Sequence, residues 1–264
     1  MCRENVDAAK IDPRMTISLP SNIPEIEICI DARTPEKTEE EVRAAYLGGA
    51  DRIELCDDMK LSGTTPKKQC IEIARNLFPP RGLIVMIRPR GGNFFFSLQE
   101  ITQMHKAIDT AAESGADGVA LGALRPPEGH MFTEVLSDLI TRAHSANLTV
   151  TLHRAFDAIP DQAKTIEWAA DVGVKRILTS GTPWETNDGS AHNLHRLQEI
   201  STLANGQIEI VAAGGINFSC AKQIATGLAD LPSPFSLHIF SGVRISKKID
   251  IKRIQQIRKK LKNA

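Results

Sequence analysis

The stretch GGADRIEL (residues 48–55) places two glycines and a short polar link directly before a short apolar strand pattern. The same order recurs in SGADGVAL (114–121) and VGVKRIL (172–178). Glycine readily adopts the left-handed conformation that ends a helix, and a strand can follow within a few residues. The three stretches therefore predict a repeated unit in which a helix ends near glycine and a strand begins.

Short apolar runs with strand character alternate with helical patterns along the rest of the chain, with no break in composition. Eight repeated strand-then-helix units predict a single α/β domain, a (β/α)8 TIM-type barrel over residues 25–264. An open doubly wound sheet is the second choice, and it loses support because no G-x-G-x-x-G motif follows the first strand. The predicted strands are 25–31, 51–55, 83–89, 118–124, 148–154, 175–180, 207–214 and 235–242.

Composition excludes several classes of protein. The chain has 264 residues with 32 basic and 32 acidic side chains, and this balance argues against nucleic-acid binding. No apolar run approaches the length of a membrane span. Residues 1–24 lack the apolar core of a signal peptide, so we expect a flexible N-terminal extension and a cytoplasmic protein. The five cysteines are an odd number without dense spacing, which makes a disulfide framework improbable.

Strand alternation predicts which side chains face the barrel interior, whose carboxyl-terminal end carries the active site in this fold. In 25–31 three isoleucines alternate with polar residues, so the isoleucines should pack under helices and the polar set should face inward. The same parity turns residues of the second, third and fifth strands toward that cavity. The predicted inward set is Glu27, Cys29, Asp31, Glu54, Cys56, Met86, Arg88, Arg90, Thr151 and His153.

Each candidate has a structural alternative. Buried thiols are often simply small apolar groups. The acids Glu27 and Glu54 could pair with the arginines of MIRPRGGN (86–93) in a structural network, or they could serve a ligand or a reaction. In HRAFD (153–157), parity turns Arg154 outward, where it could pair with Asp157. The Gly214–Gly215 turn lies where barrels of this kind commonly hold a phosphate.

Seven motifs stand in the order and spacing of the CutC copper homeostasis proteins, and the chain resembles that family from about residue 25 to 216. They are EICID, GGADRIELC, GTTP, MIRPRGGNF, TLHRAFD, RILTSG and AAGGI. The resemblance implies a cytoplasmic TIM-like barrel, dimeric or larger, with a role in copper tolerance or trafficking. In members credited with copper binding, the proposed Cu(I) ligands are two cysteines that match Cys29 and Cys56.

The chain departs from the family pattern near the eighth strand. Family members commonly carry a glutamate two residues before the histidine of that strand, whereas Ser236 stands two residues before His238 here. Family members also carry a longer segment before the last helix, where this chain has only SGVRISKK (241–248). The rim of the cavity is therefore expected to differ from that of the relatives.

Two hypotheses about function follow. The first is a copper-handling protein in which Cys29 and Cys56 bind one Cu(I), since soft thiolates select this ion. The second is an enzyme for a small carboxylate or phosphate, in which Glu27, Glu54 or His153 moves protons. Its binding residues are Arg88, Arg90, Asp157, Gly214 and Gly215. Neither needs a nucleotide cofactor, a nucleic acid or a membrane, and a homodimer or homotetramer is expected.

Overall fold

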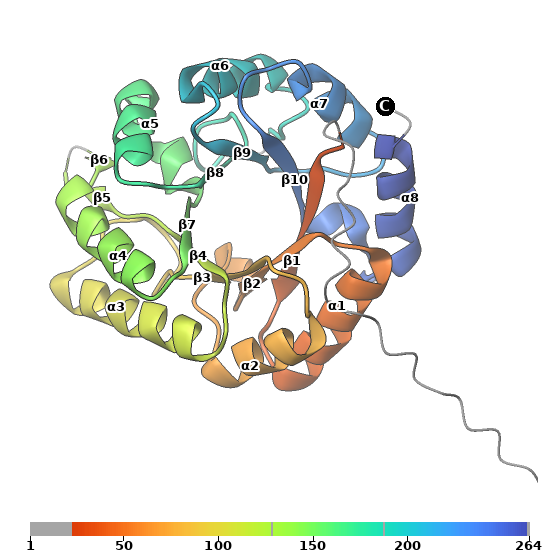
Figure 1. The fold of residues 1–264 in the computed structure, drawn as a ribbon, viewed down its shortest axis with the longest axis horizontal. Helices are drawn as coiled ribbons and strands as arrows, with labels where there is room; N and C mark the ends of the chain where they lie inside the picture. Colours follow the sequence, from red (N-terminus) through yellow and green to blue (C-terminus); the bar gives the residue numbers. More distant parts are fainter. Residues whose placement is uncertain (1–22, 128, 187, 263–264) are drawn as a thin grey trace, which may run out of the picture.

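A computed structural model describes residues 23–127, 129–186 and 188–262, so the expected extension over residues 1–24 lies almost wholly outside the described residues. Eight parallel strands close into a barrel in the order β1-β10-β9-β8-β7-β4-β3-β2, which confirms the (β/α)8 prediction (Figure 1). These strands are β1 (Glu25–Asp31), β2 (Arg52–Cys56), β3 (Leu83–Met86), β4 (Gly118–Leu121), β7 (Thr149–Leu152), β8 (Arg176–Thr179), β9 (Glu209–Ala212) and β10 (Phe235–Ile239).

Helices surround the barrel, and the last one lies between the first helix and the seventh (Figure 1). Among the described residues, no helix combines the length and apolar character needed to cross a membrane. The helices are α1 (Pro35–Gly48), α2 (Lys68–Leu77), α3 (Leu98–Glu113), α4 (Thr133–Ser145), α5 (Gln162–Asp171), α6 (Leu194–Ala204), α7 (Ala221–Leu228) and α8 (Ile251–Lys262).

Smaller elements, which the sequence patterns do not predict, decorate the loops. Three are short 3-10 helices, and four are two-residue strands that pair as β5–β6 and β11–β12. They are η1 (Met59–Leu61), η2 (Arg154–Ala158), η3 (Ser241–Val243), β5 (Leu124–Arg125), β6 (His130–Met131), β11 (Arg244–Ile245) and β12 (Lys248–Ile249).

The glycines of the repeated stretches end helices as predicted. Gly49, Gly115 and Gly173 have φ angles of 86°, 83° and 81°, in the left-handed region. The Gly49 N–H donates to the Tyr46 carbonyl and the Ala50 N–H to the Ala45 carbonyl, and the other two glycines repeat this pattern. This is the Schellman arrangement, which satisfies the last carbonyls of a helix before the chain turns into a strand.

Strand alternation separates two packing layers as predicted. Ile28 and Ile53 are fully buried in the large apolar cluster between strands and helices. Cys29 and Cys56 belong instead to a small interior cluster with Ile84, Met86 and Ala120. The parity of β1, β2 and β3 therefore matches the prediction, and the thiols face the barrel interior.

A buried ionic network fills the amino-terminal end of the barrel. The Arg52 guanidinium donates to Glu27 at 2.5 Å, to Glu25 at 2.9 Å and to both Glu209 and Ser236 at 2.7 Å. Arg52 thus forms the ion pair with Glu27 that the sequence offered, as one of two alternatives, to Arg88 and Arg90. The Ser236 hydroxyl, two residues before His238, accepts from this guanidinium.

Candidate functional site

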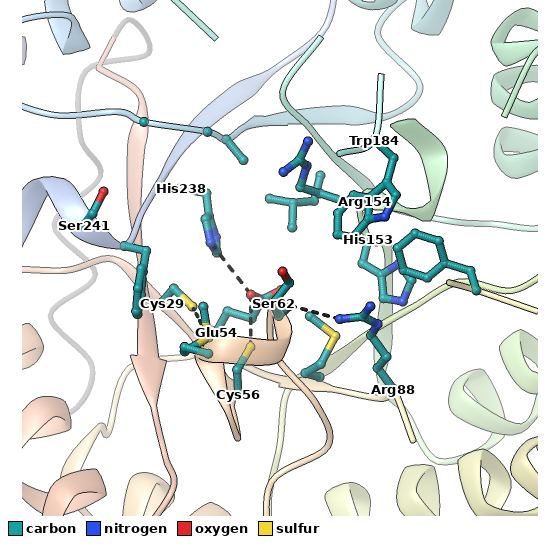
Figure 2. Close-up of a pocket in the computed structure, with 18 residues that line it drawn as sticks. Cys29, Glu54, Cys56, Ser62, Arg88, His153, Arg154, Trp184, His238 and Ser241 are labelled. Atoms are coloured by element: carbon teal, nitrogen blue, oxygen red, sulfur yellow. Dashed lines mark hydrogen bonds and ion pairs between the residues drawn. The ribbon is translucent and has the colours of Figure 1, made fainter. Parts of the chain in front are cut away.

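A cavity of about 270 Å³ opens at the carboxyl-terminal end of the barrel, where the fold places functional residues (Figure 2). One wall carries sulfur, a carboxylate and an imidazole, and the other carries arginine, histidine and aromatic side chains. Its principal lining residues are Cys29, Glu54, Cys56, Met59, Ser62, Met86, Arg88, Phe94, His153, Arg154, Trp184, Gly214, Gly215, His238, Phe240 and Ser241.

The two predicted thiols meet at one point of this cavity. Adjacent strands β1 and β2 deliver Cys29 and Cys56, and the sulfur atoms and a Glu54 carboxylate oxygen all lie within 4.8 Å of one another. The Cys56 Sγ lies 3.4 Å from Glu54 Oε2, and the Cys29 Sγ lies 3.8 Å from the thioether Sδ of Met59. Three sulfur atoms and one carboxylate therefore share a small buried volume.

His238 of β10 reaches over this group from the opposite side of β1. Its Nδ1 lies 2.6 Å from Glu27 Oε1, and its Nε2 lies 3.8 Å from Glu54 Oε2. Although burial opposes the charged form, Glu54, Cys29 and Glu27 raise the pKa of His238 well above its ordinary value. These neighbours therefore favour the protonated form of the imidazole, which is placed beside the thiols.

The buried acids and thiols have strongly shifted pKa values. A hydrogen bond from Cys56, followed by His238, lowers the pKa of Cys29 to about 6. The same contact with Cys29, together with burial, raises the pKa of Cys56 well above its ordinary value. Burial raises the pKa of Glu54 to about 8. The contact between the two thiols therefore favours the thiolate at Cys29 and the thiol at Cys56, and burial favours the protonated form of Glu54.

Glu27 is inward, as the parity predicts, but it lies below the cavity. Burial disfavours its charge, yet Arg52 and His238 outweigh this and lower its pKa to about 2. It is therefore a fixed carboxylate that orients His238. Of the three predicted proton-transfer residues, the structure brings Glu54 and His153 to the cavity wall and leaves Glu27 behind it.

Arg88 lies in the cavity wall, but its terminal nitrogens donate to backbone carbonyls and not into the cavity. Its two terminal nitrogens donate to the carbonyls of Leu61, Ser62, Gly63 and Gly92 at 2.7 to 3.2 Å. The guanidinium carbon also lies 4.9 Å from the centre of the Phe94 ring. Only Nε lacks a partner within the described residues. Arg88 therefore fixes the loop after β2.

His153 presents one unused donor to the cavity. Its Nδ1 accepts from the Ala155 N–H at 3.1 Å, so the neutral ring carries its proton on Nε2. Nε2 is buried and has no hydrogen-bond partner within the described residues. Burial, with the nearby Arg88 charge, lowers the pKa of His153 to about 3. The neutral His153 ring can thus donate its Nε2–H to a ligand, because buried polar groups rarely stay unpaired.

The structure corrects two predicted anion-binding residues. Arg90 does not line the cavity: in the loop after β3, its Nε donates to Glu100 at 2.6 Å and its guanidinium lies 5.2 Å from the centre of the Phe96 ring. Asp157 does not line the cavity either. Asp157 accepts from Arg154 Nε at 2.7 Å and from Ser180, which makes it a support for that arginine.

Arg154 is the second arginine of the cavity, against the outward orientation that parity predicts. The strand β7 ends at Leu152, and Arg154 begins the 3-10 helix η2, where strand alternation no longer applies. Its pairing with Asp157 is as predicted, and its guanidinium lies 5.0 Å from the Trp184 ring. Figure 2 shows it pointing toward the cavity opposite His238.

The predicted Gly214–Gly215 turn lines the cavity beyond Arg154. Both residues have left-handed φ angles of 91° and 68°, which side chains rarely adopt. A Cβ on Gly214 would lie 3.0 Å from the Ser180 side chain. Glycine is therefore required for the turn, and it leaves the backbone open to the cavity.

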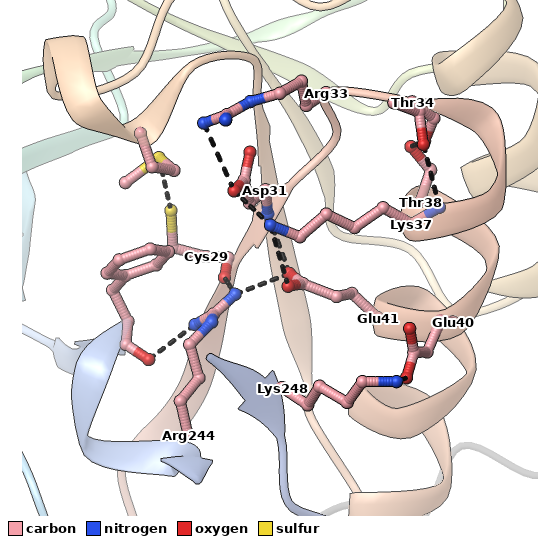
Figure 3. Close-up of polar contacts among 12 residues, drawn as sticks. Cys29, Asp31, Arg33, Thr34, Lys37, Thr38, Glu40, Glu41, Arg244 and Lys248 are labelled. Atoms are coloured by element: carbon pink, nitrogen blue, oxygen red, sulfur yellow. Dashed lines mark hydrogen bonds and ion pairs between the residues drawn. The ribbon is translucent and has the colours of Figure 1, made fainter. Parts of the chain in front are cut away.

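The segment after β10 holds β1 in place from outside the cavity (Figure 3). Arg244 donates to the Cys29 carbonyl at 3.0 Å and to Glu41 at 2.5 Å, and its guanidinium stacks on Phe240 at 4.0 Å. Asp31 is a further correction: it ends β1 and pairs with Lys37 at the start of α1, so it lies outside the cavity.

Sequence reasoning missed several residues of the cavity, among them His238 and Met59, and turned Arg154 away from it. His238 could have been found by parity, because it alternates with the outward Leu237 and Ile239 of β10. Met59 and Arg154 lie on short 3-10 helices, for which no periodic signal exists in the sequence.

The fold and site define a class of protein: a (β/α)8 barrel with a thiol-, carboxylate- and imidazole-lined cavity at its carboxyl-terminal end. The CutC family model matches residues 24–235, and the chain belongs to the CutC family. It is 38% identical over 204 residues to the family protein CutC of Rhizobium meliloti (strain 1021), covering 77% of each chain.

Two further comparisons, with one relative and one solved structure, indicate the same family. The chain is 40% identical over 202 residues to the family protein CutC of Bacteroides fragilis (strain NCTC 9343), covering 76% of this chain and 78% of the relative. Among solved structures, it is similar to CutC from Streptococcus agalactiae, a protein assigned to copper homeostasis. That match has a TM-score of 0.70 and 28% identity, and it covers 82% of this chain and 98% of the other.

Proposed function

We propose that this protein is a cytoplasmic copper-handling protein that binds one Cu(I) through the thiolates of Cys29 and Cys56. The observation that carries the proposal is the convergence of the two buried sulfurs and Glu54 within 4.8 Å at the base of the cavity. Thiolates are the soft ligands that Cu(I) prefers, and the donor set fits that ion. The assignment of the related Streptococcus protein to copper homeostasis supports the same role.

The electrostatics of the cavity favour a monovalent cation held by two thiolates. The lowered pKa of Cys29 favours its thiolate, whereas the raised pKa of Cys56 opposes loss of the second proton that metal binding requires. The resulting group carries one net negative charge. A protonated His238 beside it would offset that charge in the low-dielectric interior, where an unpaired charge is costly.

The test is an anaerobic titration of Cu(I) against a chromophoric Cu(I) chelator. Cys29→Ser and Cys56→Ser are each expected to weaken Cu(I) binding at least 100-fold, because one thiolate is lost from a two-thiolate site. Cys70→Ser is the matched control: Cys70 is equally buried but packs among the helices, so binding should be unchanged. Unchanged affinity in the doubly substituted Cys29→Ser/Cys56→Ser protein would contradict the proposal.

A second function, an enzyme for a small carboxylate or phosphate, is favoured by the opposite wall. His153 Nε2 and Arg88 Nε are buried donors that have no partner in the part of the chain that the structure describes, and Arg154 lines the same cavity. A ligand oxygen would satisfy such donors, and a charged arginine favours an anion. The Gly214–Gly215 turn, which follows β9, also lines the cavity. Glu54, whose protonated form burial favours, could then supply a proton to a bound substrate.

This second function is tested by thermal unfolding in the presence of inorganic phosphate and, separately, malonate. Binding to the folded state alone stabilises it by RT ln(1 + L/Kd), where L is the free ligand concentration, so Tm rises as L is increased above Kd. His153→Asn keeps an acceptor for the Ala155 N–H but removes the Nε2 donor, so the rise should fall or vanish. Arg90→Gln, which lies outside the cavity, should leave it intact. No rise in Tm for the wild-type protein with either anion would contradict this function.

A further inference from the structure

The loop after β2 carries Met59 beside the two thiols, and several hydrogen bonds hold this loop in place. Asp57 and Thr64 exchange two backbone hydrogen bonds of 2.9 and 2.8 Å, which close the loop at its base. Arg88 holds the loop's far side through the carbonyls of residues 61, 62 and 63. The Asp58 side chain accepts from the Lys60 N–H at the start of η1. These hydrogen bonds therefore hold the backbone around Met59 in place.

The Met59 thioether lies within the sulfur group. Its Sδ is 3.8 Å from the Cys29 Sγ, and the side chain packs against the cluster that contains both thiols. A Cβ on Gly63 would lie 3.2 Å from the Cys56 Sγ and 3.7 Å from the Met59 Sδ, so one small volume borders both sulfurs. Glycine at 63 leaves that volume free.

We infer that Met59 supplies a third sulfur ligand, so that the cavity is a three-sulfur site that selects Cu(I) over Zn(II). The inference rests on the proposed function of Cys29 and Cys56. A thioether is a soft, neutral ligand that binds without losing a proton, and it suits Cu(I). Zn(II) prefers thiolate, imidazole and carboxylate, all of which remain available in the cavity without Met59.

A second methionine in the cavity provides a comparison for the half-buried Met59. Met59 is one of two methionines in the cavity, the other being Met86 on β3. Met86 is buried in the same interior cluster as the two thiols, and among the described residues its sulfur makes no hydrogen bond to either thiol. Of the two methionines, Met59 is therefore the one whose sulfur has an observed short contact with a thiol sulfur, at 3.8 Å.

Met59→Leu tests the inference, with Met86→Leu as its matched control. Leucine keeps the apolar volume and removes only the sulfur. We expect Met59→Leu to weaken Cu(I) binding at least tenfold in chelator competition and to leave Zn(II) binding within twofold. Copper X-ray absorption should give three sulfur neighbours in the wild-type protein and two in Met59→Leu. Met86→Leu should match the wild type in all three measurements, and Tm values should show that both variants fold.

The outcomes separate this inference from the proposed function. If the wild-type protein binds Cu(I) no more tightly than Cys29→Ser/Cys56→Ser, the proposed function fails and the third ligand fails with it. If the wild type binds Cu(I) but Met59→Leu keeps its affinity and its sulfur count, the thiolate site stands and the role of Met59 is overturned. An equal loss of Cu(I) and Zn(II) binding in Met59→Leu would overturn the selectivity.

Discussion

The Nδ1 atom of His238 lies 2.6 Å from the Glu27 carboxylate, on the side of the ring opposite the sulfur group. Glu27 is held in turn by Arg52 at 2.5 Å, so the imidazole is oriented by a carboxylate that cannot move away. This chain of three residues links the ionic network of the barrel floor to the thiols. The position of the His238 imidazole is therefore set by the fold itself.

His238→Gln should raise the pKa of Cys29. The hydrogen bond from Cys56 contributes most to the lowering, and the imidazolium contributes next, so the variant loses part of the effect. The pH dependence of iodoacetamide alkylation, read for the Cys29 peptide by mass spectrometry, measures it. His105→Gln, on the outer helix α3, is the control. An unshifted alkylation profile in His238→Gln would show that the imidazole does not influence this thiol.

His153→Asn should change how stability depends on pH. The folded-state pKa of His153 is about 3, below the ordinary value of 6.5, so the unfolded chain binds more protons between these values. The free energy of unfolding therefore rises with pH across that window, by up to about 1.4 kcal/mol per pH unit from this group. Urea unfolding from pH 4 to 7 should give a shallower slope in His153→Asn, and parallel slopes would refute the assignment.

Arg52→Met should destabilise the barrel strongly. The substitution leaves Glu27 buried without its main partner, and breaking a buried ion pair by removing one side costs about 3–5 kcal/mol. The free energy of unfolding in urea measures the loss. Arg142→Ala, which removes an ion pair with Asp109 on the helix surface, should have little effect. Equal stability of the Arg52 and Arg142 variants would contradict the role of the floor network.

Oxidation should join Cys29 to Cys56. Their sulfurs lie within 4.8 Å of each other, and Cys29 is the thiolate that attacks. Diamide treatment followed by thiol counting should remove two reactive thiols from the wild type and none beyond background from Cys29→Ser. Prior loading with Cu(I) should protect both thiols. A disulfide that involves Cys70 or Cys220 instead would show that the two barrel thiols cannot meet.

The sequence predicts the barrel well because strand alternation and glycine-ended helices are local patterns. The same alternation correctly turns Cys29, Glu54 and Cys56 inward, since these residues lie within regular strands. It fails for Arg90 and Arg154, which lie past the ends of β3 and β7. Beyond a strand end, loop geometry and tertiary contacts orient the side chain, and no periodic pattern records them.

Local sequence patterns also do not show which groups the charged residues pair with. Parity alone places Arg52 inside the barrel, but its contact with Glu209 spans most of the chain and depends on barrel closure. Arg88 resembles an anion-binding residue in sequence, whereas in the structure it donates to carbonyls of a loop 25 to 27 residues earlier. Met59 belongs to that loop, so its place beside Cys29 also follows from tertiary structure.

Native mass spectrometry under anaerobic conditions tests the central claim most directly. Wild-type protein mixed with excess Cu(I) and then desalted should carry one copper per chain. The measured mass should equal that of the fully protonated protein plus one copper, minus the mass of the protons that the two thiols lose. The Cys29→Ser/Cys56→Ser protein, folded by circular dichroism, should carry none. Retention of one copper by that variant, or a wild-type protein that retains no copper, would contradict the account.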